Sequence, residues 1–122
     1  MPGFELFGEE EKKQVNEVLE TGILMRYGFD GPRKGIWKSK ELEAAVCSTF
    51  GSQYAQLTSS GTAALTTAMA ALGVGAGDEV IMPAFTFVAS FEAILSMGAI
   101  PVLVDIDESL TLSPAAVKAA IT

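Results

Sequence analysis

From residue 54 onward, short apolar segments alternate with segments of helical periodicity. We predict strands over 54–58, 79–82 and 101–106, and helices over 63–72, 86–97 and 115–121. The predicted strands are apolar throughout, which is typical of strands that are buried on both faces. Strict alternation of strand and helix favours parallel strands with a helix in each crossover. The sequence therefore predicts an α/β fold, with a mostly parallel sheet and helices on both of its faces.

The first fifty residues follow another pattern. Apolar residues at helical spacing predict a helix over 9–21, and Ser39 can cap a second helix that ends near residue 50. Between these helices, residues 23–36 contain three glycines and one proline, which predicts a loop. We therefore divide the chain into an N-terminal arm with a cationic loop, residues 1–38, and the first part of a larger domain, residues 39–122.

Composition excludes several classes of protein. Apolar residues make up 49% of the sequence and charged residues 19%, a balance that excludes intrinsic disorder. The sequence contains no histidine, which excludes Ser/His/Asp and Cys/His triads and histidine metal sites, and we predict no metal. The single cysteine, Cys47, cannot form an intramolecular disulfide, and its apolar neighbours predict a buried, unreactive thiol.

Hydropathy and charge restrict the partners. The longest nearly apolar segment, 93–104, is shorter than the ~18 residues that a membrane-spanning helix needs. The N-terminus lacks the basic and apolar regions of a signal peptide, so we predict a cytoplasmic protein without a membrane contact. A net charge of -7 opposes binding to a nucleic-acid backbone. Residues 26–40 nevertheless carry five basic residues and one acidic residue. This cationic segment is either a solvated loop or a binding element for a small anionic group.

Two glycine-containing segments differ in their context. Residues 73–77 (GVGAG) follow a predicted helix and precede a strand, so we interpret them as a tight turn and not as a phosphate loop. Residues 59–63 (SSGTA) follow a strand and precede a helix, where free backbone N–H groups and the helix dipole favour an anion. Ser60 and Thr62 add hydroxyl donors. The segment is either a simple helix cap or a phosphate site.

Two aromatic residues, Phe85 and Phe87, lie where the second predicted strand gives way to a helix. They either close the core or offer a flat face to a ring whose phosphate occupies the turn at Gly61.

Taken together, these segments resemble the DegT/DnrJ/EryC1/StrS aminotransferases. Four segments match in order and spacing, at 59–65 (SSGTAAL), 75–81 (GAGDEVI), 83–89 (PAFTFVA) and 101–107 (PVLVDID). The resemblance implies the N-terminal part of a fold type I large domain that binds pyridoxal 5'-phosphate and aminates keto or aldehyde sugars. It implies that Ser60, Gly61, Thr62 and Ala63 hold the cofactor phosphate and that Phe87 stacks on the pyridine ring.

The resemblance also implies what these residues lack. In the family, the Schiff-base lysine and the carboxylate that pairs with the pyridinium nitrogen lie further along the chain, so no catalytic residue is predicted within residues 1–122. None of the lysines matches the catalytic position. Asp105 and Asp107 are interpreted as the end of a strand and the start of a turn. Because the alternation also stops after a helix, we expect these residues to be a fragment of a protein several times longer.

A closer resemblance concerns the first forty residues. Residues 1–8, 26–30 and 37–38 resemble the branch that aminates C8 of a 3-deoxy-octulosonate sugar acid. In the cationic loop, Arg26, Tyr27 and Arg33 are our candidates for contacting the acid group of the sugar, across the interface of a homodimer. We expect glutamate as the amino donor. Two alternatives are a sugar dehydratase of the same family and a non-catalytic α/β module that binds phosphate.

Overall fold

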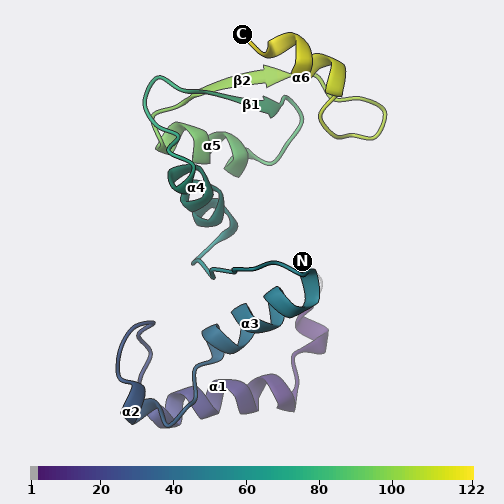
Figure 1. Cartoon of the computed structure of the whole chain (residues 1–122). Coiled ribbons are helices and arrows are strands. Elements are labelled where there is room, and N and C mark those ends of the chain that lie inside the picture. Colours follow the sequence, from purple (N-terminus) through teal and green to yellow (C-terminus); the bar gives the residue numbers. More distant parts are fainter. Residues whose placement is uncertain (1–2) are drawn as a thin grey trace. The chain divides into compact units, whose positions relative to one another are not determined.

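The computed structural model describes residues 3–122, so the first two residues of the predicted arm and of the segment 1–8 lie outside the described residues. The chain forms two compact units, which divide between Leu57 and Thr58. The first unit contains a short 3-10 helix, η1, and three α-helices (Figure 1). Their bounds are Phe4–Leu6 for η1, Glu9–Thr21 for α1, Asp30–Arg33 for α2 and Lys38–Phe50 for α3.

Helices α1 and α3 confirm the two helices predicted in this unit. The predicted cap is wrong, because α3 begins at Lys38 after Trp37, Ser39 lies within the helix, and no side chain caps it. The side chain of Glu11 accepts a hydrogen bond of 2.7 Å from the Gly8 N–H, which satisfies one backbone donor at the start of α1. Both helices end at a glycine with left-handed backbone angles, Gly22 with φ 67 and Gly51 with φ 67. Glycine adopts this conformation readily because it has no β-carbon. An ion pair of 2.7 Å between Lys38 and Glu17 joins the first residue of α3 to α1.

Helix α2 is a single turn within the predicted loop, and the sequence pattern does not reveal it. Two non-glycine residues in the left-handed region, Phe29 with φ 62 and Lys34 with φ 53, flank the turn. A helix of four residues offers too few apolar positions to show a period. Its formation therefore depends on side-chain contacts that come from elsewhere in the loop.

The second unit confirms the α/β class with a small parallel sheet. Its elements are α4 (Gly61–Ala71), β1 (Glu79–Pro83), α5 (Val88–Ser96), β2 (Ile100–Val104) and α6 (Pro114–Ala120). Strands β1 and β2 pair in parallel from Glu79↔Ile100 to Pro83↔Val104, and α5 is the crossover between them (Figure 1). Helix α5 packs against both strands, α4 packs on α5, and α6 packs against β2.

The core of this unit lies between α5 and the two strands. Met82, Ile94 and Ala99 form its centre, and Ala93 in α5 is fully buried at 0% exposure. Apolar segments of both strands thus cover the inner side of α5, as their composition predicts. In the described part of the chain, no helix is long and apolar enough to cross a membrane.

The structure corrects the strand predicted over 54–58. These residues have no regular secondary structure. A strand is held by backbone partners on a neighbouring strand. Instead, the Leu57 N–H donates a 2.8 Å hydrogen bond to a carboxylate oxygen of Glu43 in α3.

The structure also corrects the prediction for Cys47, which is partly exposed and not buried. No residue of α1 or α3 is buried within the described residues.

Candidate functional site

The turn before α4 places its small residues as a helix cap. Ser60 has an extended backbone, and its hydroxyl accepts a hydrogen bond of 3.1 Å from the Ala63 N–H. The hydroxyl of Thr58 donates to the Ser60 carbonyl at 2.9 Å, which fixes the approach to the helix. Within the described residues, the N–H groups of Gly61 and Thr62 have no hydrogen-bond partner. Two backbone donors therefore remain for an anion at the positive end of an eleven-residue helix.

The space above this turn is open. A β-carbon built on Gly61 would meet no heavy atom within 4 Å. Thr62 is half-buried, and its hydroxyl makes no hydrogen bond to another described residue. Free N–H groups, an available hydroxyl and an unobstructed approach are the features that a bound phosphate requires. The residues of the turn therefore fit a phosphate group.

The two aromatic residues at the carboxyl end of β1 are both exposed. Phe87 lies immediately before α5 and is 77% exposed, and Phe85 is 66% exposed. Phe85 therefore does not close the core of this unit, whose centre is Met82, Ile94 and Ala99. Both rings are available to cover another group.

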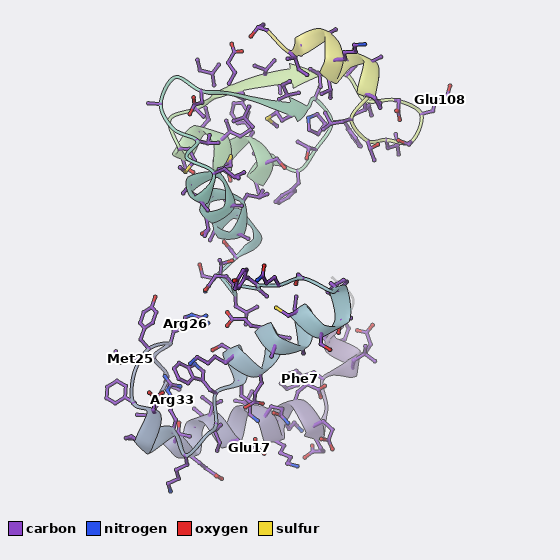
Figure 2. The ribbon with its side chains drawn as sticks, viewed as in Figure 1. Phe7, Glu17, Met25, Arg26, Arg33 and Glu108 are labelled. Carbon is purple, nitrogen blue, oxygen red and sulfur yellow. The ribbon has the colours of Figure 1, made fainter. Side chains whose placement is uncertain are left out.

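Arg33 is used inside the first unit. It is 5% exposed, the only buried charged residue among residues 3–122. Its Nε donates to the Gly28 carbonyl at 2.9 Å, and a terminal nitrogen donates to the Met25 carbonyl. Its guanidinium also lies 4.4 Å from the centre of the Trp37 ring, and Figure 2 shows it pointing into the loop. Arg33 thus supplies the contacts that hold α2 and the loop before it.

Arg26 and Tyr27 are placed differently. A terminal nitrogen of Arg26 donates to Glu43 at 2.7 Å and to the side chain of Gln56 at 3.3 Å. Tyr27 is 76% exposed. A cavity of about 270 Å³ brings Arg26 and Arg33 together with Trp37 and Lys38, but Tyr27 does not line it.

Sequence analysis missed Glu43, which is the acidic partner of this loop. The Leu57 N–H, followed by the hydrogen bond and charge of Arg26 and the charge of Lys40, lowers the pKa of Glu43 below its ordinary value. An acidic residue within a predicted amphipathic helix gives no spacing signal for such a role. Its partners lie 17 residues before it and 14 residues after it.

Lowering the pH is expected to reduce the stability of the first unit through protonation of Glu43. Because the pKa of this carboxylate is lowered in the folded state, its bonds stabilise the unit above the ordinary glutamate pKa, and this contribution is lost as the pH falls through the lowered pKa. The fluorescence of Trp37, which lies beside Arg33 and Lys40, is the measurement. The Glu43→Gln variant should lack this part of the acid transition; an identical transition in the variant would contradict the assignment to Glu43.

Comparison with known proteins places this geometry in a family. The sequence model of the DegT/DnrJ/EryC1/StrS aminotransferase family matches residues 6–122. The chain belongs to this family. Its parallel βαβ arrangement matches the N-terminal part of the fold type I large domain, and solved structures similar to this chain include a PLP form and one with bound PMP.

Solved structures of the family superpose closely. The chain is 35% identical to 3-amino-5-hydroxybenzoic acid synthase, with a TM-score of 0.87, and the match covers 99% of this chain and 30% of that one. It is 33% identical to DesV of S. venezuelae in complex with a ketimine intermediate, with a TM-score of 0.81, covering 93% of this chain and 28% of that one.

A third solved structure has a different activity. A GDP-4-keto-6-deoxymannose-3-dehydratase with a trapped PLP-glutamate geminal diamine is 28% identical, with a TM-score of 0.77, covering 95% of this chain and 30% of that one. The chain therefore spans less than a third of the length of each of these three proteins.

Proposed function

We propose that this chain supplies the phosphate- and ring-binding part of a pyridoxal-phosphate sugar aminotransferase that takes its amino group from glutamate. The observation that supports it most is the turn before α4, where the N–H groups of Gly61 and Thr62 and the Thr62 hydroxyl have no hydrogen-bond partner among the described residues. Bound pyridoxal phosphate supplies the electron sink for amino transfer. The residues described below bind and orient the cofactor and the substrate.

In this proposal the turn holds the phosphate. The Gly61 and Thr62 N–H groups and the Thr62 hydroxyl donate to it, and the dipole of α4 adds roughly 0.3 to 1 kcal/mol. The Ser60 hydroxyl already accepts from the Ala63 N–H and can still donate its own proton. Ala63 contributes by its small side chain, since its N–H is satisfied. Phe87 supplies a flat exposed face for the pyridine ring.

The Phe87→Ala variant of the full-length enzyme is expected to bind the cofactor roughly 2- to 13-fold more weakly, because a stacked aromatic pair contributes about 0.5 to 1.5 kcal/mol. Titration of the cofactor absorbance measures this effect. Phe85→Ala is the matched control, because Phe85 is similarly exposed at the same corner. Equal losses in both variants would remove the specific stacking role of Phe87.

We further propose that the substrate is a keto or aldehyde sugar that carries an acid group, as a 3-deoxy-octulosonate does. Arg26 and Tyr27 would contact the acid group, and Arg33 would position the loop, because its donors are taken by the Gly28 and Met25 carbonyls. The product named in 3-amino-5-hydroxybenzoic acid synthase also carries a carboxyl group. The planar fork of arginine suits such a group.

The Arg26→Lys variant is expected to raise the KM for the acid-bearing sugar roughly threefold to tenfold, because lysine keeps the charge but loses the guanidinium N–H groups that face the acid group. The KM for glutamate should not change. Steady-state kinetics with each substrate varied in turn test this, with Lys34→Arg as a control in the same loop. Equal increases for both substrates would favour a solvated loop without a substrate role.

A dehydratase is the second candidate, supported by the similarity to the 3-dehydratase. The two activities leave different products, an amino sugar or a deoxy sugar, which mass spectrometry separates. A non-catalytic phosphate-binding module would give neither product.

We also infer a cytoplasmic homodimer. Exposed apolar side chains of the first unit support the dimer, among them Phe4 at 84% and Leu6 at 78% exposure. Sedimentation of the full-length enzyme tests the dimer.

A further inference from the structure

Glu43 connects three segments of the first unit. One of its carboxylate oxygens, Oε1, accepts hydrogen bonds from Arg26 at 2.7 Å and from the Leu57 N–H at 2.8 Å. The Glu43 side chain is 13% exposed, against 31% for Arg26. A single carboxylate on α3 thus joins the cationic loop to the segment that directly precedes the phosphate-binding turn in the sequence.

The charge of Glu43 is favoured by its surroundings. The Leu57 N–H has the largest effect, and Arg26 and Lys40 are the charged groups that add to it. Each of them stabilises the ionised form, so the carboxylate keeps its charge near neutral pH. Partly buried charge-assisted hydrogen bonds of this kind are stronger than those between neutral groups.

The same contacts leave part of Arg26 available. One terminal nitrogen donates to both Glu43 and Gln56, the latter at 3.3 Å. No described residue accepts a hydrogen bond from its Nε or its other terminal nitrogen. The N–H groups of these two nitrogens can still donate to the oxygens of an acid group. Glu43 therefore holds one terminal nitrogen of Arg26 and leaves the Nε and the other terminal nitrogen for a ligand.

We propose that Glu43 is a positioning residue, which orients Arg26 toward the acid group of the sugar and anchors residues 54–57 ahead of the phosphate-binding turn. The first role rests on the proposed function of Arg26. The second role follows from the Leu57 hydrogen bond alone. The two roles can be separated, because glutamine keeps an oxygen that can accept from Leu57 but carries no charge for Arg26.

The anchoring role is tested on the 122-residue chain by amide hydrogen exchange. In Glu43→Ala, exchange at Leu57 should accelerate about tenfold, because the N–H loses its acceptor. In Glu43→Gln, the Leu57 N–H should stay largely protected. Glu41→Gln is the control, since Glu41 lies on the same helix and pairs with Lys38. Unchanged exchange at Leu57 in Glu43→Ala would overturn the anchor.

The orienting role is tested by kinetics of the full-length enzyme. Glu43→Gln should raise the KM for the acid-bearing sugar about tenfold and leave kcat and the KM for glutamate unchanged. If Arg26→Lys raises this KM and Glu43→Gln does not, the orienting role is wrong. If neither variant changes it, the proposed contact between Arg26 and the sugar is wrong, and the orienting role falls with it.

Discussion

The 122-residue chain by itself is expected to transfer no amino group from glutamate to a keto sugar. Amino transfer on pyridoxal phosphate needs a lysine that binds the cofactor covalently and later moves a proton. The chain has six lysines, and none occupies a position that matches the catalytic lysine of the family. Five lie in the first unit, and Lys118 lies in the last turn of α6. Borohydride treatment with cofactor, followed by mass mapping, should find no stoichiometrically labelled lysine.

One result would overturn this expectation. A single lysine labelled in every molecule, together with measurable amino transfer to a keto sugar, would show that these residues contain the whole catalytic apparatus. Scattered labelling without turnover would agree with the expectation, because free lysine amines react with the cofactor aldehyde without a specific site. The full-length enzyme serves as the positive control for labelling and for activity.

Thr62→Ala in the full-length enzyme is expected to raise the dissociation constant of the cofactor roughly tenfold to a hundredfold. The hydroxyl of Thr62 would donate to a charged phosphate, and one such hydrogen bond contributes ~1.5 to 3 kcal/mol. Folding should change little, since the Thr62 hydroxyl makes no hydrogen bond to another described residue. Equilibrium titration of cofactor absorbance gives the dissociation constant, and thermal unfolding without cofactor gives the effect on stability.

Two further variants make this prediction specific. Thr62→Ser keeps the hydroxyl and should keep most of the affinity. Thr67→Ala changes an exposed threonine further along α4 and should have no effect on cofactor binding. An unchanged dissociation constant in Thr62→Ala would mean that the turn before α4 is a helix cap without a phosphate role.

The second unit was predictable because its signals are local. Continuous apolar segments predicted β1 and β2, and the helix predicted over 115–121 corresponds to α6, where the Ser113 hydroxyl accepts from the Ala116 N–H. Residues 54–58 carried the same apolar signal. Their conformation instead depends on a carboxylate fourteen residues before Leu57, which no local pattern reports.

The candidate site divides in the same way. The anion-binding turn follows from a strand-to-helix junction, which the sequence shows. The sequence does not show which donors of the turn are free, because the Ser60 hydroxyl accepts the hydrogen bond of the Ala63 N–H. In the cationic loop, sequence analysis treated Arg26 and Arg33 alike. Burial separates them, since Arg33 is enclosed by its own loop and Arg26 is held at its edge.

The register of β1 and β2 has a consequence for the order of folding. Glu79 pairs with Ile100 and Pro83 with Val104, so the ends of this unit are close in sequence and one helix closes the connection. Contacts over such short separations form rapidly, because little chain entropy is lost in bringing them together. We expect this βαβ unit to become structured soon after residue 104 leaves the ribosome, before any later strand is available to pair with it.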